Sequence, residues 1–228
     1  YVNAQRREND LPEVAAARGA LLAMDLETGD LLAIASAPTF DQNVFTRRPS
    51  DPEAVNAILG DDVLQPLQNR AIEAFPPAST FKVLSSYTLL EHGFAAPQER
   101  FACTASITFG GITWQNWIDS YRGNYDVTEA IADSCNTYYF RAAMETPAFS
   151  EGWSPFIEAL HDDAITFGYG EPVGIGLPGE RAGRVPDETW TRDVKDTPWY
   201  PGYTLNTMIG QGDVLATPLQ TVRALSAF

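Results

Sequence analysis

The chain has 228 residues, 15 Lys and Arg against 30 Asp and Glu, a net charge of −15 at neutral pH and 44% hydrophobic residues. This length suits one domain with a sizeable core, and the apolar fraction is that of an ordinary globular protein. The acidic balance argues against binding nucleic acid or docking on anionic lipid, because both require clustered Lys and Arg. No apolar run approaches the ~20 residues that would span a bilayer, and Tyr1-Val2-Asn3 is no signal peptide.

The first predicted element is a β-hairpin. Residues 20–25 and 30–36 are apolar runs joined at Glu27-Thr28-Gly29, a turn signal. Residues 40–74 carry prolines, charges and mixed polarity, so we expect them to wrap the surface before the helix that contains Ser79.

A helix is predicted to begin close to Ser79, because Pro76-Pro77 cannot continue a preceding helix, and to run to about Glu91 before Gly93. Residues three apart share a helix face, so Lys82 could reach the Ser79 hydroxyl and take its proton. This requires a neutral amine, and burial lowers the pKa of a lysine by disfavouring the ammonium. An ordinary helix start is the alternative interpretation of this pair.

The later elements follow in order. Residues 101–117 alternate in polarity and are predicted as strands or loops at the edge of a cleft, and a capping box at Asp126 and Glu129 opens a short helix to about Asp133. Further helices are predicted at 138–144, at 155–160 and from Thr217-Pro218-Leu219-Gln220, which combines an N-cap, a first-turn proline and a glutamine.

The triplet Ser134-Cys135-Asn136 falls where the short helix ends. Residues two apart diverge on a helix but share a side in extended backbone, so Ser134 and Asn136 can point together into a cleft only from such a loop. One could relay protons and the other could bind an amide. The alternative is that Asn136 caps a helix starting near Thr137.

Cysteines, histidines and aromatic residues add less. Cys103 and Cys135 are too few for a disulfide framework, and the sequence does not decide whether they pair; buried free thiols are the favoured interpretation. His92 and His161 have no ligand or triad spacing, so we predict structural or surface roles and no metal site. Aromatic residues gather around the triplet, and most should be core or groove wall: Trp114, Trp117, Tyr121, Tyr125, Tyr138 and Tyr139.

Ser79-Thr80-Phe81-Lys82 followed by Ser134-Cys135-Asn136 resembles the first two motifs of the penicilloyl serine transferases, which include penicillin-binding proteins and serine β-lactamases. Residues 76–82 are similar to the start of the active-site helix of class B penicillin-binding proteins, although Ala78 stands where many have glycine. Other stretches are similar to the same transpeptidase domains, the last three to the elongation type of side-wall synthesis: 174–180, 198–202, 209–212 and 216–220. The likeness runs from about Arg18 to the end.

The resemblance implies an α+β fold of the penicillin-binding and serine β-lactamase type, an antiparallel sheet with helices on both sides. It makes Ser79 the acylated nucleophile, Lys82 its general base, Ser134 a proton shuttle and Asn136 a ligand of the donor peptide. The family's third motif, Lys-Thr-Gly on a strand beyond Gln220, does not occur in these 228 residues. We therefore interpret the chain as a partial transpeptidase domain over 18–228, preceded at 1–17 by the end of a non-catalytic pedestal.

The implied reaction is D,D-transpeptidation of peptidoglycan stem peptides through a serine acyl-enzyme, with β-lactams acylating the same serine and with no metal or organic cofactor. The implied location is extracytoplasmic, behind a single N-terminal membrane anchor upstream of this chain. The implied partners are a polytopic membrane glycosyltransferase and scaffold proteins of the elongation complex that maintains cell shape.

Two alternatives to this hypothesis are weighed. A class D-like β-lactamase or β-lactam sensor would also suit residues 77–82, but Asn136 and the 210–220 stretch disfavour it. A non-catalytic cell-wall assembly module is supported only by the missing third motif.

Overall fold

The computed structural model describes residues 18–228, so the predicted pedestal residues 1–17 lie outside the described part. The chain divides into two compact units at Glu73/Ala74. The predicted α+β class is confirmed, with strands and helices in the following order: β1 Gly19–Met24, β2 Leu31–Ala37, η1 Gln42–Phe45, α2 Pro52–Leu59, η2 Ala78–Phe81, α3 Lys82–Glu91, β3 Phe101–Cys103, β4 Ser106–Phe109, β5 Ile112–Gln115, β6 Gly123–Tyr125, α4 Val127–Ala132, α5 Asn136–Met144, η3 Phe149–Glu151, α6 Pro155–Thr166, α7 Glu188–Lys195, α8 Pro201–Thr207 and α9 Pro218–Leu225.

The first unit contains the predicted hairpin. β1 and β2 pair antiparallel, with Leu22 opposite Ile34. The Asp25 carboxylate accepts the backbone N–H groups of Glu27 and Thr28, which closes the turn between the strands. The sequence analysis missed α2, which begins at an Asp-Pro signal: the Asp51 side chain accepts from the Ala54 amide and Pro52 takes the first helical position.

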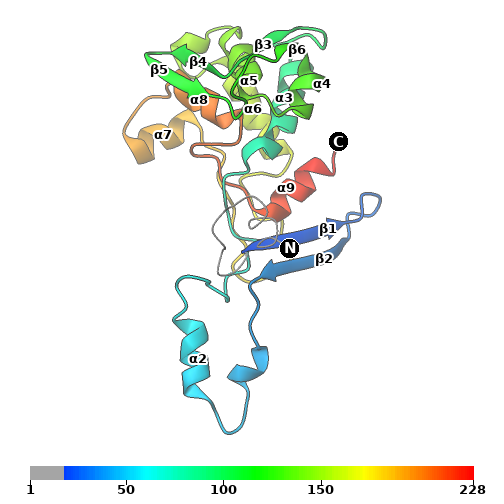
Figure 1. Ribbon diagram of the computed structural model, residues 1–228, viewed down its shortest axis with the longest axis vertical. Helices are drawn as coiled ribbons and strands as arrows, with labels where there is room; N and C mark the ends of the chain where they lie inside the picture. The colour runs from blue at the N-terminus through cyan, green and yellow to red at the C-terminus, as the bar shows by residue number, and fades with distance from the viewer. Residues whose placement is uncertain (1–17) are drawn as a thin grey trace. The chain divides into compact units, whose positions relative to one another are not determined.

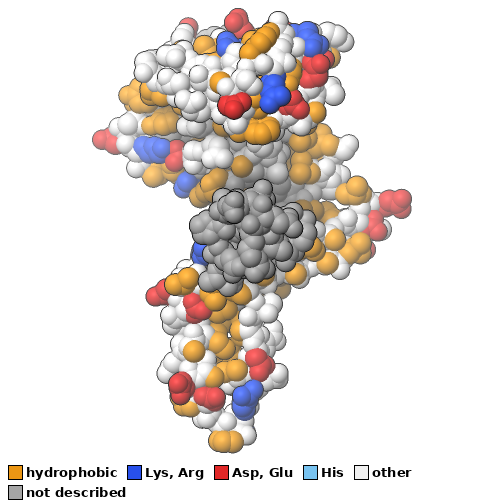
Figure 2. Space-filling model, in the orientation of Figure 1, with side chains coloured by type: hydrophobic (Ala, Val, Ile, Leu, Met, Phe, Trp, Pro, Cys, Tyr) orange, Lys and Arg blue, Asp and Glu red, His pale blue; other side chains and the backbone are white. Residues whose placement is uncertain are grey.

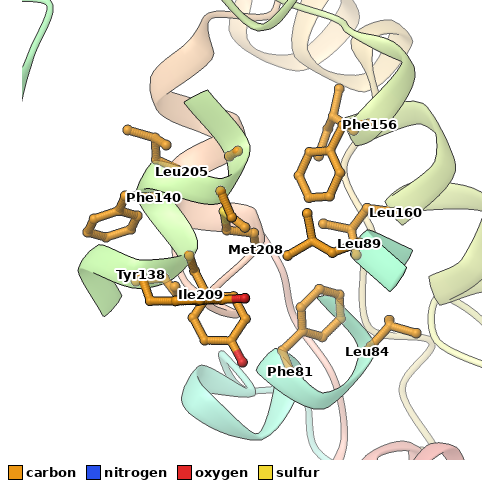
Figure 3. Close-up of a cluster of buried hydrophobic side chains, with 14 of the residues drawn as sticks. Phe81, Leu84, Leu89, Tyr138, Phe140, Phe156, Leu160, Leu205, Met208 and Ile209 are labelled. Atoms are coloured by element: carbon orange, nitrogen blue, oxygen red, sulfur yellow. The ribbon is translucent and has the colours of Figure 1, made fainter. Parts of the chain in front are cut away.

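The second unit holds the main core. α3 packs on α6, and α5 packs on β3. Side chains from the end of η2, from α3, α5 and α6, and from α8 and the residues after it converge on one apolar cluster (Figure 3), whose labelled members are Phe81, Leu84, Leu89, Tyr138, Phe140, Phe156, Leu160, Leu205, Met208 and Ile209. The Ser85 hydroxyl also donates to the Met208 carbonyl oxygen at 2.7 Å, which joins α3 to the end of α8.

The predicted antiparallel pairing is confirmed, and among residues 18–228 it takes the form of three two-stranded sheets, β1-β2, β3-β6 and β4-β5. The last two come from the 101–125 stretch and lie near α5 in the second unit (Figure 1). In β4-β5, Ile107 faces Trp114 and Phe109 faces Ile112 across the pair.

Helix boundaries follow local signals closely. The capping boxes at Asp126 and Thr217 open α4 and α9 as predicted. The predicted helix at 155–160 is α6 and extends to Thr166. Two further helices were missed, although each has a start signal: an Asp187 cap for α7 and Pro201 at the start of α8.

The prediction of free thiols is wrong. Cys103 and Cys135 form a disulfide, with Cα atoms 6.2 Å apart. Cys103 ends β3 and Cys135 directly precedes α5, and these two elements pack together. The pairing depends on that packing, which nothing in the local sequence around either cysteine indicates.

On the face shown in Figure 2, Lys and Arg side chains are dispersed among Asp and Glu over the visible surface. Across residues 18–228, no helix is both long and apolar enough to cross a membrane.

Candidate active site

Ser79 lies in the 3-10 turn η2, which continues directly into α3. The backbone N–H of Lys82 donates to the Ser79 carbonyl oxygen, the i to i+3 bond of a 3-10 turn, and side chains three apart in such a turn are eclipsed. The turn therefore places the exposed Ser79 and Lys82 on the same side, as the helical spacing predicts.

The residues before Ser79 are held by the segment after α8. Ala78 adopts a left-handed conformation with φ 52°, and its N–H donates to the Gly210 carbonyl oxygen at 2.8 Å. Phe75 and Ala216 exchange both backbone hydrogen bonds, at 2.9 and 2.8 Å. These contacts set the direction of the chain as it enters the turn.

The Lys82 side chain is only 2% exposed, although it carries an amine. Its Nζ donates to the Asn136 Oδ1 at 2.6 Å, to the Ser134 Oγ at 3.0 Å and to the Ser134 carbonyl oxygen at 2.7 Å. Its Nζ also lies 5.5 Å from the ring centroid of the buried Tyr139. The amine is thus surrounded by oxygen acceptors and an aromatic face instead of water.

Burial lowers the pKa of Lys82 from its ordinary 10.5 to about 8, because removal from water penalises the charged ammonium. A lysine with this pKa is partly neutral near physiological pH and can accept a proton. The burial that a neutral amine at this position requires is therefore present.

Ser134 and Asn136 lie where α4 ends and α5 begins. Ser134 has φ 52°, in the left-handed region, and Asn136 is the first residue of α5. The two side chains converge on the Lys82 amine from a sequence separation of more than fifty residues. The alternative in which Asn136 caps the following helix is wrong, because Asn136 lies inside α5 and its side-chain oxygen accepts from Lys82.

The residues that hold this loop, Asn116 and Trp117, were not predicted as part of the site. Asn116 accepts the Asn136 backbone N–H at 3.0 Å, and the Trp117 indole donates to the carbonyl oxygens of Asp133 and Ser134 at 3.0 and 3.1 Å. Trp117 belongs to the aromatic set of which most members were predicted as core or groove wall, and at 68% exposure it is not a core residue. An asparagine directly after a strand carries no recognisable signal of such a role.

Chemically, this arrangement combines an exposed hydroxyl with a desolvated amine one turn later, and adds a second hydroxyl and an amide that both bond the amine. Such a set can deprotonate an alcohol and pass the proton between Lys82 and Ser134. The site therefore has the design of a serine acyltransferase that uses an amine as its base.

Comparison with known proteins agrees with this class. The family model of the penicillin binding protein transpeptidase domain matches residues 19–228. Peptidoglycan D,D-transpeptidase MrdA of Salmonella typhimurium is 34% identical over 94% of this chain and 33% of its own length. A solved peptidoglycan synthase complex contains a chain that is 44% identical, with a TM-score of 0.85 over 99% of this chain and 37% of that one. The imipenem acyl-enzyme of penicillin-binding protein A from Mycobacterium tuberculosis is 28% identical, with a TM-score of 0.74 over 92% and 45% of the two chains.

The chain belongs to the family of penicillin-binding protein transpeptidase domains. It spans about a third of the length of the curated relatives it matches.

Proposed function

We propose that residues 18–228 of this chain are part of the transpeptidase domain of a peptidoglycan D,D-transpeptidase of the elongation type. The observation that carries the proposal is the Lys82 amine, buried one turn after Ser79 and hydrogen-bonded to Ser134 and Asn136. The similarity of this chain to the peptidoglycan D,D-transpeptidase MrdA supports D,D-transpeptidase activity for this chain as well.

In the proposed acylation, the Ser79 Oγ attacks the carbonyl carbon of the penultimate D-alanine of a stem peptide. The Oγ–C bond forms while the C–N bond to the terminal D-alanine breaks. Lys82 takes the Ser79 proton, and Ser134 passes a proton to the leaving amine. Asn136 binds the donor peptide through the side-chain amide that also contacts Lys82.

The turn η2 also supplies a hydrogen-bond donor for the attacked carbonyl group. Ser79 lies in the first turn of η2, where a backbone N–H has no acceptor within the helix, so the Ser79 N–H can donate to the oxyanion that develops on the attacked carbonyl. In the second step, an amine of a neighbouring stem peptide attacks the Ser79 ester. The cross-linking amide forms and Ser79 recovers its proton.

The same serine would accept β-lactams, as in the imipenem acyl-enzyme of the Mycobacterium tuberculosis relative. The proposed location is the outer side of the cell membrane, and the proposed partners are a polytopic glycosyltransferase and scaffold proteins of the elongation machinery. The similarity to a chain of a solved peptidoglycan synthase complex supports partners of this general kind.

The decisive experiment is the intact mass of the protein after brief incubation with a penicillin, followed over hours. It is run on this chain and on a version that continues to the natural C-terminus of the gene product. We expect a lasting adduct that maps to Ser79 and is absent from Ser79→Ala. Labelling that persists in Ser79→Ala would overturn the nucleophile assignment.

The other outcomes identify the alternatives. An adduct that forms and disappears within minutes would identify a β-lactamase. No adduct on either version, with both folded by circular dichroism, would identify a non-catalytic assembly module.

A further inference from the structure

We propose that Asn116 is a positioning residue that holds Asn136 and its loop in the conformation that meets Lys82. The inference rests on the proposed function, because the position of Asn136 matters for acyl transfer only if this site carries the reaction. It identifies a residue outside the two sequence motifs whose side chain holds the loop of the second motif in place.

The N-terminus of α5 has no side-chain cap from its own N-cap residue. Its N-cap residue is Cys135, which makes no side-chain capping bond and whose sulfur is committed to the disulfide. The N–H groups of the first turn of a helix have no partner within the helix. The Asn136 N–H instead donates to the Asn116 Oδ1, which comes from 20 residues earlier in the chain. Asn116 therefore replaces the missing cap.

The other end of the Asn116 amide is also anchored. Its Nδ2 donates to the Thr104 carbonyl oxygen at 3.0 Å and lies 3.4 Å from the Thr137 Oγ1. It also lies 3.6 and 3.4 Å from the two sulfurs of the Cys103–Cys135 disulfide. Because donor and acceptor ends each meet complementary partners, the amide has one favourable orientation.

The anchor itself is rigid. Thr137 is fully buried, accepts the Thr104 N–H at 2.9 Å and donates to the Thr104 carbonyl oxygen at 2.9 Å. Asn116 thus connects Asn136 to a buried polar cluster formed by Thr104, Thr137 and the disulfide.

Both chain neighbours of Asn116 also form hydrogen bonds with the loop that contains Ser134 and Asn136. The Gln115 carbonyl oxygen accepts from the Asn136 Nδ2 at 3.5 Å. The Trp117 indole donates to the Ser134 carbonyl oxygen, which also accepts from Lys82. Ser134 has a left-handed conformation, which is strained for an L-residue and persists only where the surroundings determine it. Residues 115–117 supply those surroundings.

The test compares Asn116→Leu, which removes both ends of the amide at similar volume, with Asn116→Asp, which keeps an oxygen for the Asn136 N–H. The control is Leu160→Ala, a buried apolar substitution in α6 that removes none of these hydrogen bonds. The first readout is hydrogen exchange of the Asn136 backbone N–H, measured by NMR, which does not require an active enzyme. The second is penicillin acylation of the full gene product, separated into the affinity for penicillin and the rate of acylation.

We expect Asn116→Leu to speed hydrogen exchange of the Asn136 backbone N–H about tenfold, the factor for one lost hydrogen bond. We expect the exchange rate in Asn116→Asp to stay closer to that of the wild type. We expect acylation to slow by up to about a hundredfold, mainly in its rate and not in the affinity for penicillin, since a misplaced group costs about that factor. If Asn116→Leu does not fold, the same comparison is made with Asn116→Asp against Asn116→Ser.

The outcomes separate the two proposals. A wild-type protein that forms a penicillin adduct, with exchange and acylation unchanged in Asn116→Leu, would overturn the role of Asn116 alone. So would a loss of acylation no greater than in Leu160→Ala at an equal fall in melting temperature. A wild-type protein that forms no adduct would overturn the proposed function, whatever the exchange result.

Discussion

The N–H of Ala78 donates to the carbonyl oxygen of Gly210 at 2.8 Å, which joins the residue before the candidate nucleophile to the segment after α8. The two backbones approach so closely that a Cβ on Gly210 would lie 2.3 Å from the Ala78 carbonyl oxygen and 2.7 Å from the Phe81 Cβ. The conformation of the turn that carries Ser79 therefore depends on a glycine more than 130 positions later.

Gly210→Ala should destabilise the protein by about 2–4 kcal/mol, because it adds overpacking to the cost of a left-handed alanine. Gly93→Ala is the matched control: Gly93 has φ 69° against 66° for Gly210, but a Cβ there would meet nothing within 4 Å. The control should lose only about 1 kcal/mol. Urea unfolding measures both. Equal losses would show that the close contact with Ala78 does not matter.

Penicillin acylation should rise with pH and reach half of its maximum near pH 8, because only the neutral Lys82 amine can accept the Ser79 proton and its pKa is about 8. An initial-rate series from pH 6 to 10 on the full gene product, with folding checked at each pH, measures this. A midpoint at pH 10 or above would mean that the Lys82 amine keeps its ordinary pKa.

The same pKa shift predicts how stability changes with pH. Lys82 titrates at about 8 when folded and at about 10.4 when unfolded, so between these values the unfolded chain binds more protons. The contribution of Lys82 to the free energy of unfolding therefore rises with pH across this window. In Lys82→Met this rise should be absent, and the difference between the two pH slopes in urea unfolding is the measurement. Parallel slopes would contradict the shift.

Tyr139→Phe should cost about 1–3 kcal/mol of stability, because it leaves the buried Ser86 hydroxyl without the partner it now has at 2.8 Å. The ring near Lys82 remains, so the pH midpoint of acylation should not move. Adding Ser86→Ala to Tyr139→Phe removes both polar partners and should recover part of the loss. A double variant that is as destabilised as the sum of the two singles would show that this hydrogen bond contributes no coupling.

Replacing both cysteines by alanine should lower the free energy of unfolding by about 4 kcal/mol, because the disulfide closes a loop with a sequence separation of 32 and restricts the unfolded chain. Urea unfolding of the wild type with and without reductant, beside the double variant, measures this. Reductant should move the wild type to the midpoint of the double variant and should not affect the variant. An unchanged wild-type midpoint under full reduction would contradict the expected contribution.

Several elements could be predicted because their signals are local. The apolar runs of β1 and β2, the proline pair before η2 and the capping boxes of α4 and α9 each act within a few residues. The missed helices α2, α7 and α8 also begin at Asp or Pro signals, but each is only seven or eight residues long, so its apolar pattern covers about two turns.

The sequence by itself determined which chemical groups this protein offers: a serine and a lysine one turn apart, and a second motif at the junction of two short helices. Only the tertiary structure decided how they meet, because the partners are far apart in the chain. The separation is 32 residues for the disulfide, 20 for the Asn116–Asn136 bond and 52 to 54 for the Lys82 contacts. Contacts at such separations follow from the packing of helices around a shared core, which local residue patterns do not encode.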